Sequence, residues 1–138
     1  MSLRALTLPA VLAAGLAGCG GGGGKQDVCS NKDGALSNSA FVFVDSPGSG
    51  DRVSSGFEVS GCSSTFEGTL GWRLLARDGH TLAKGTAQGG SLDPGPFAFT
   101  IEYAVPSREL GRLTVSAPRV TSEGFPPVQN VIPLVLDT

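Results

Sequence analysis

Short runs of alternating polar and apolar residues, separated by turn residues, constrain the fold of this chain more than any other feature. The clearest run is residues 70–77 (LGWRLLAR). Because residues two apart on a strand share a face, its apolar side chains should enter a core while Arg73 and Arg77 meet water. The apolar set is Leu70, Trp72, Leu74 and Ala76. Residues 78–79 (Asp-Gly) suit the positive φ of a tight hairpin turn, so we expect a return strand at 81–87.

Further runs of the same kind predict an all-β chain. With the hairpin they give seven strands, at residues 41–45, 57–62, 70–77, 81–87, 96–104, 111–117 and 129–136. The side chains expected to point inward from the later runs include Phe97, Phe99, Ile101, Tyr103, Leu113 and Val115. Pro133 cannot donate to a ladder, which indicates that the last strand is an edge strand or a bulged one. Seven short strands in about 98 residues predict an immunoglobulin-like β-sandwich.

The N-terminal segment has the three parts of a secretory signal. Arg4 supplies positive charge, an apolar stretch runs from Ala5 to Ala17, and small residues lead to Cys19. The stretch is too short for a transmembrane helix, which needs about 20 apolar residues, and Pro9 interrupts it. The ending LAGC, residues 16–19, resembles the lipobox of bacterial lipoproteins. This resemblance implies a diacylglyceryl group on the Cys19 thiol and cleavage just before it; the alternative is an ordinary signal peptide with a chance cysteine.

Five glycines follow Cys19, at residues 20–24, and Lys25 comes next. A phosphate-binding loop would need a strand before it, a helix after it and usually a Lys-Ser/Thr pair, whereas Gln26 follows Lys25 here. A flexible tether is favoured, and five glycines span about 12 Å on a root-mean-square basis. We therefore expect three parts: a cleaved signal at 1–18, a lipidated cysteine with its tether at 19–40, and a β-sandwich at 41–138.

Three cysteines are an odd number for an exported chain. Assigning Cys19 to lipid leaves Cys29 and Cys62, which an oxidising compartment would pair. Two free thiols are the alternative; a metal site would need more ligands than one histidine and no Cys-x-x-Cys motif provide. By parity Cys62 points away from the Phe57 and Val59 face unless Gly61 forms a bulge. A disulfide would then clamp the N-terminal segment on the outside or edge of a sheet.

The sequence displays no constellation for catalysis or metal binding. His80, the only histidine, lies in the expected hairpin turn without a recognisable nucleophile or orienting group, so we expect a solvated turn residue. Calcium ligands could come from residues 31–34, Asp45 and Asp51, but the spaced acidic loop of such a site is missing and ordinary turn chemistry is favoured. We predict no catalytic residue, no metal and no cofactor.

The charge of the chain argues against nucleic acid as a partner. Charged residues make up 16% of the sequence and the net charge is −2, which gives no electrostatic footprint. We expect Glu67 and Glu102 on solvent faces. Leu75, on the polar side of its strand, is a weak indication of a partner surface.

Several phrases resemble a known family. They are SPGSGDRVSSGFEVSG (46–61), FEGTLGWRLLARDGHTLAKGTA (66–87), GPFAFTI (95–101) and VIPLVL (131–136). Together they are similar to the immunoglobulin-like domain of bacterial spore germination proteins, the second of the GerMN-associated domains. The resemblance covers about residues 41–137 and implies a β-sandwich in a bacterial envelope or extracytoplasmic protein. It brings no catalytic residues to carry over.

We therefore expect a non-enzymatic lipoprotein, anchored to a membrane and facing the extracytoplasmic side of a bacterial envelope. Its sandwich would bind or position another envelope component, which could be a protein, peptidoglycan or another copy of the chain. The alternative is a structural or solute-binding envelope protein with a pocket between its sheets. An enzyme ranks third, because it would need a catalytic group that the sequence does not display.

Overall fold

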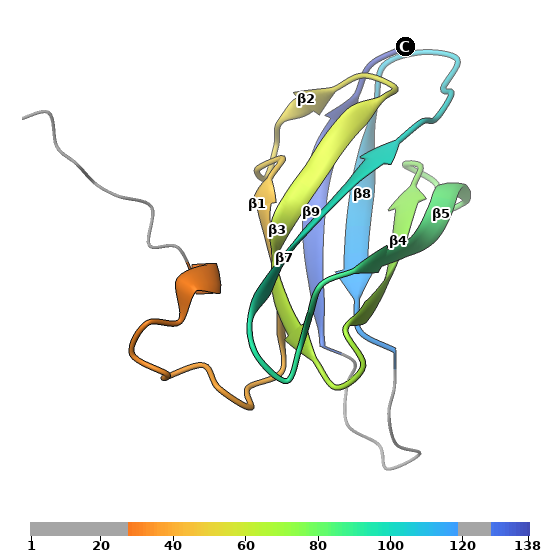
Figure 1. Ribbon diagram of the computed structural model, residues 1–138. Coiled ribbons are helices and arrows are strands. Elements are labelled where there is room, and N and C mark those ends of the chain that lie inside the picture. The colour runs from red at the N-terminus through yellow and green to blue at the C-terminus, as the bar shows by residue number, and fades with distance from the viewer. Residues whose placement is uncertain (1–27, 119–127) are drawn as a thin grey trace, which may run out of the picture.

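The computed structural model describes residues 28–118 and 128–138 (Figure 1). Within these residues a short 3-10 helix precedes nine strands, which form two sheets. In chain order the elements are η1 (Val28–Ser30), β1 (Phe41–Ser46), β2 (Arg52–Val53), β3 (Phe57–Thr65), β4 (Thr69–Leu75), β5 (Thr81–Gln88), β6 (Gly90–Ser91), β7 (Gly95–Ile101), β8 (Glu109–Ser116) and β9 (Gln129–Leu136). The predicted all-β, immunoglobulin-like sandwich is confirmed. No helix in these residues is long and apolar enough to cross a membrane.

The two sheets differ in how their strands pair. In the four-stranded sheet, β3 is antiparallel to both β1 and β7, and its last two residues pair in parallel with β6. The five-stranded sheet has the order β2-β9-β8-β4-β5, antiparallel except for the β2–β9 pair. Figure 1 shows β9 and β8 behind β3 and β7, with β4 to the right of β8. Strands far apart in sequence therefore share each sheet.

The seven strands expected from the sequence are all present, with changed ends. β3 continues to Thr65, three residues past the predicted end, and β7 stops at Ile101 where its partner β3 begins. The two-residue strands β2 and β6 were not predicted, because they lie in segments rich in turn residues. They exist through pairing with β9 and β3, which no local pattern reveals.

The core lies between the sheets and consists of the side chains that the period-two pattern turns inward. Seven of them have no exposed surface: Val59, Leu70, Leu74, Ile101, Leu113, Val115 and Leu136. Trp72 is only partly buried and stacks on Phe99 across the two sheets, with ring centroids 5.1 Å apart. Arg73 and Arg77 are exposed, as expected, and so are Glu67 and Glu102.

Pro133 lies at a position of β9 where the backbone nitrogen does not have to donate a hydrogen bond to β8. Its carbonyl accepts a hydrogen bond from the Gly50 N–H at 2.8 Å, and the Val135 N–H donates to Asp51 at 2.9 Å. Because residues two apart in a strand direct their backbone groups to the same side, residue 133 faces away from β8. The β8–β9 register is unbroken, and β9 is next to the edge of its sheet, flanked there only by the two-residue β2.

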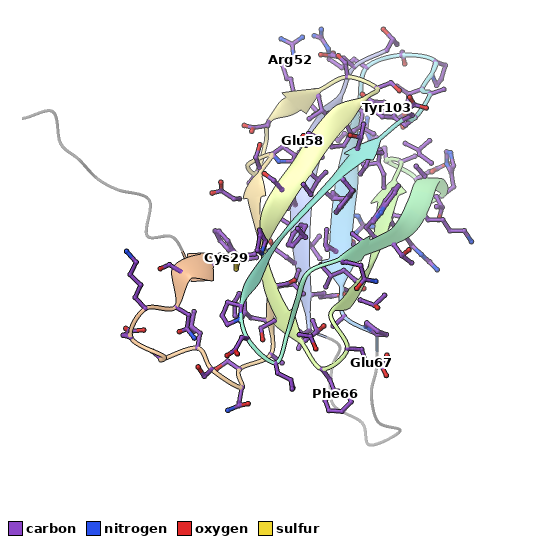
Figure 2. The ribbon with its side chains drawn as sticks, viewed as in Figure 1. Cys29, Arg52, Glu58, Phe66, Glu67 and Tyr103 are labelled. Atoms are coloured by element: carbon purple, nitrogen blue, oxygen red, sulfur yellow. A yellow bond between two sulfur atoms is a disulfide. The ribbon has the colours of Figure 1, made fainter. Side chains whose placement is uncertain are left out.

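A disulfide holds the segment before β1 against the four-stranded sheet. Cys29 in η1 is bonded to Cys62 in β3, with their Cα atoms 5.6 Å apart (Figure 2). Cys62 pairs with Phe43 in regular register, so it lies on the outer face of β3, opposite in parity to Val59. Gly61 forms no bulge in β3; a Cβ there would approach the Phe97 ring to 2.7 Å. Residues 28–40 are thus attached to the sandwich, with a second contact from the Asn38 N–H to the Leu92 carbonyl.

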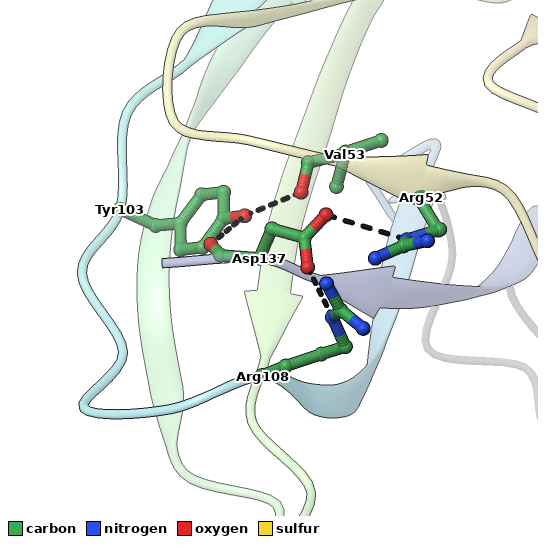
Figure 3. A network of polar contacts seen from close by, with 5 residues as sticks. All are labelled: Arg52, Val53, Tyr103, Arg108 and Asp137. Atoms are coloured by element: carbon green, nitrogen blue, oxygen red, sulfur yellow. Dashed lines mark hydrogen bonds and ion pairs between the residues drawn. The ribbon is translucent and has the colours of Figure 1, made fainter.

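A polar cluster fastens the opposite end of the sandwich (Figure 3). The Tyr103 hydroxyl lies 2.8 Å from the carbonyl oxygen of Val53 and 2.7 Å from that of Asp137, and donates its proton to one of them at a time. Burial raises the pKa of Tyr103. The Asp137 carboxylate accepts a hydrogen bond from Arg108, which holds its pKa below the ordinary value, and pairs with Arg52 at 3.5 Å. These contacts join β2, the residue that follows β9, and the segment between β7 and β8.

Candidate binding face

The outer face of the five-stranded sheet is the most distinctive surface of the described residues. Its side chains are those that alternate with the buried residues of β4, β5 and β8. Leu70 and Leu74 of β4 are fully buried. Because successive residues of a strand point to opposite faces, Gly71 and Arg73, which lie next to them in the strand, are on the outer face. The same parity turns Thr114 outward from between Leu113 and Val115.

A shallow groove with a volume of about 500 Å³ crosses three strands on this face. We call it the basic groove and define it by its outward-facing lining residues, which are Gly71 and Arg73 of β4, Lys84 and Thr86 of β5, and Thr114 and Ser116 of β8. Trp72 and Gly85 also line it, at the inward positions that alternate with these. The strand register sets out the outward-facing residues in two rows. Gly71 lies between Thr86 and Ser116, and Arg73 lies between Lys84 and Thr114.

Gly71 forms the floor of the groove, and neither packing nor backbone conformation requires a glycine there. A Cβ added at Gly71 would meet no heavy atom within 4 Å, and its φ is outside the left-handed region. Gly85 differs, because a Cβ there would come within 2.6 Å of the Trp72 ring. A glycine inside a strand weakens it and often marks a place where a ligand or another backbone comes close. Because Gly71 has no side chain, the space above the centre of the groove is left empty.

The cations of this face lack partners within residues 28–118 and 128–138. Arg73, Lys84 and the neighbouring Arg112 make no ion pair or side-chain hydrogen bond there, whereas Arg52 and Arg108 both bind Asp137. The sequences of β4, β5 and β9 contain no Asp or Glu. The one acidic residue of β8, Glu109, is on the inward parity at the strand's start, opposite Leu136. A positive patch therefore stands on a chain whose net charge is −2.

Apart from Leu75, the candidate site residues named from the sequence lie outside this face. Cys19 is outside the described residues, and Cys29 and Cys62 form the disulfide on the other sheet. His80 is exposed in the β4–β5 turn, where its ring contacts the Asp78 carboxylate. The backbone N–H of His80 also donates to Asp78, and these contacts lower the pKa of Asp78. Leu75 is half-buried on the candidate face, at the position that pairs with Arg112.

Three of the residues considered for calcium, Asn31, Asp33 and Asp51, make turn contacts. Asn31 and Asp33 accept hydrogen bonds from the backbone N–H groups of Leu36 and Ala35, and Asp51 accepts one from Gly48. In the part of the chain that the structure describes, no three His, Cys, Asp or Glu side chains group closely enough to hold a metal ion. The groove itself was missed from the sequence. Within the sequence of β4, the one feature that pointed to the groove was Gly71 next to the outward-facing Arg73. The other groove residues come from β5 and β8, and only the pairing of these strands with β4 brings them together.

Comparison with known families supports the fold. Residues 41–121 match the family described as the immunoglobulin-like domain of bacterial spore germination, a span that contains β1 to β8. Immunoglobulin-like domains of this family are generally non-catalytic. No curated protein and no solved structure matches the chain significantly.

Proposed function

Because the chain belongs to the family of immunoglobulin-like domains of bacterial spore germination, we propose that it is a non-catalytic binding module of a bacterial cell envelope. The face that binds is the outer face of the five-stranded sheet, and the bound component is another envelope molecule. The observation that carries this proposal is a set of cations around a groove, none of which has an ion-pair partner within residues 28–118 and 128–138. Fold membership alone would support many functions, so the argument rests on this surface.

The geometry of the face suits binding better than catalysis. A catalytic site needs a nucleophile, a base and an orienting group within hydrogen-bond reach of one another. The basic groove offers cations and hydroxyl groups, which bind and orient an anion but do not supply a base near neutral pH. The groove also lies on the outer face of a sheet, and none of the described residues forms a cover that would exclude water from a reaction.

We propose further that Cys19 carries the lipid anchor. One acyl chain gives marginal membrane binding, whereas two or more hold a protein stably. The disulfide at Cys29 attaches the chain to the sandwich, so the connection to the membrane is residues 20–28. A flexible glycine-rich chain of that length would span on the order of 15–18 Å. The module would then work close to the membrane surface, facing the extracytoplasmic side.

Site-specific photo-crosslinking in cells of the source organism tests the binding role. A photoreactive residue replaces Thr86, which is exposed beside the groove, and in a matched variant it replaces Ala98, which is exposed on the four-stranded sheet. We expect a discrete adduct from position 86 that is absent from position 98. If neither position gives an adduct, or both give the same one, the binding role of this face is refuted.

The anchor needs its own test. Detergent phase partition and mass spectrometry would compare the wild-type chain with Cys19→Ala. We expect the wild type in the detergent phase with a lipid mass on its N-terminal cysteine, and the variant in the aqueous phase. If both partition into water with unmodified N-termini, the anchoring proposal fails, while the binding proposal stands on the crosslinking result.

The solute-binding alternative ranks second. A volume of about 500 Å³ lies in the usual range for small-molecule sites. Such sites bury most of the ligand's surface, whereas this groove lies on the outer face of one sheet, where one side of a ligand stays in contact with water. Saturable binding of a small neutral solute would favour the alternative.

A further inference from the structure

We propose that the basic groove binds an extended acidic peptide segment of a partner protein, with carboxylates at alternate positions. This inference rests on the proposed function and names the partner's chemistry. Its starting point is charge complementarity: Arg73, Lys84 and Arg112 have no carboxylate partner among the described residues, and the outward positions of their strands hold no acidic residue.

The spacing of the three cations matches an extended chain. Arg73 pairs directly with Lys84 on β5 and with Thr114 on β8, and Arg112 is two residues before Thr114. Directly opposed residues have Cβ atoms about 5 Å apart and diagonal ones about 7–8 Å apart. In an extended peptide, side chains on one face repeat every two residues, or about 6.6 Å. Acidic residues at alternate positions can therefore reach successive cations.

The rest of the groove serves the peptide's main chain. Thr86, Thr114 and Ser116 carry hydroxyl groups, each of which can donate to a peptide carbonyl or accept from a peptide N–H. Gly71 between them lets a backbone approach the sheet without meeting a side chain. The two arginines can each bind a carboxylate through two parallel hydrogen bonds. The groove thus offers sites for both the carboxylates and the amides of one segment.

A peptide fits this face better than the other polyanions of an envelope. Sugar rings of an anionic glycan would need flat apolar rings to stack on, and the outward positions of β4, β5 and β8 include no aromatic residue. Trp72 does line the groove, but it is at an inward position of β4 and its ring stacks on Phe99 of the other sheet. An anionic glycan is therefore an outcome of the test and not the proposal.

The test uses the full chain in a non-ionic detergent and a fluorescent peptide of alternating Glu and Thr residues, followed by anisotropy. We expect saturable binding that weakens with added salt, because exposed charges are screened. Arg73→Gln and Lys84→Gln should each weaken binding roughly two- to five-fold, the range of exposed ion pairs. Arg77→Gln and Lys32→Gln remove the same charge from exposed positions outside the groove and should leave binding unchanged.

Two further variants separate shape from charge. Gly71→Leu fills the floor and should abolish binding, while Ala98→Leu adds the same bulk to the other sheet and should not. Circular dichroism melting reports whether Gly71→Leu remains folded. Independently of that variant, Arg73→Glu should weaken binding of the Glu-Thr peptide and strengthen binding of a Lys-Thr peptide.

Four outcomes would overturn the proposal. They are equal binding of a Gln-Thr peptide, equal loss from Arg77→Gln and Arg73→Gln, undiminished binding by a folded Gly71→Leu, and tighter groove-dependent binding of polygalacturonate. If the peptide fails while the crosslink from position 86 persists, the partner chemistry is wrong and the binding function stands. If both fail, the face has neither role.

Discussion

The disulfide between Cys29 and Cys62 should contribute a large share of the stability of this fold. In the chain-entropy model, closing a separation of 33 residues removes about 12.5 cal/mol/K of unfolded-state entropy. At 25 °C this corresponds to about 3.7 kcal/mol, against a total of roughly 5–15 kcal/mol for a typical domain. Replacing both cysteines with alanine should therefore lower the free energy of unfolding by about 3–4 kcal/mol.

The assay is urea unfolding of the full chain in a Cys19→Ala background, which leaves only one pair of thiols. The double variant Cys29→Ala, Cys62→Ala should unfold at a lower urea concentration than the disulfide-bonded parent. Adding a reductant should move the parent to the position of the variant and leave the variant unchanged. A difference below about 1 kcal/mol, or a reductant effect on the variant, would refute the reasoning.

The same variant should also release the segment before β1. Residues 28–40 are attached to the sandwich by the disulfide and by the hydrogen bond from Asn38 to Leu92. Lys32 is exposed in this segment. Without the disulfide, tryptic cleavage after Lys32 should accelerate while the sandwich resists digestion. Unchanged cleavage at Lys32 would show that other contacts hold the segment.

Three further predictions concern the core and the polar cluster. Leu74→Ala should lower the free energy of unfolding by about 2–5 kcal/mol in urea titrations, because Leu74 is fully buried, whereas Leu75→Ala on the outer face should cost much less. Tyr103→Phe should cost about 0.5–1.5 kcal/mol in the same assay, because the partly buried Asp137 carbonyl loses its hydroxyl donor, whereas the Val53 carbonyl keeps the hydrogen bond from the Asp137 N–H. The pKa of Asp137 is lowered from 3.8, chiefly by the hydrogen bond from Arg108, so its contribution is present above that pH and is lost as the pH falls through its folded pKa. Asp137→Asn should therefore be less stable than the wild type at neutral pH, with a difference that shrinks below about pH 4; a gap independent of pH would refute this assignment.

Much of the fold could be predicted because its signal is local. The alternation in residues 70–77 placed Leu70 and Leu74 in the core, and the Asp-Gly pair at 78–79 marked the hairpin. The parity of Cys62 indicated an outer-face position, where it binds Cys29. The strands β2 and β6 escaped prediction because each is two residues long and depends on a partner distant in the chain.

The candidate site could not be predicted, because no short stretch of sequence contains it. Arg73, Lys84 and Arg112 each look like ordinary solvent-facing charges on separate strands. Only the antiparallel register of β5, β4 and β8 places them side by side. Net charge was equally uninformative, since it averages the acidic turns with this one basic face.

The sequence by itself determined the all-β architecture, the positions of seven strands and the inward set of four of them, because period-two alternation is a property of neighbouring residues. It also supplied the expectation of a lipid on Cys19, which depends on a short linear motif. The tertiary structure decided which strands pair and where the disulfide holds the N-terminal segment. It also decided which cations lie next to one another around Gly71. The physical reason is that pairing depends on contacts between residues far apart in the chain, and the binding face is made of such contacts.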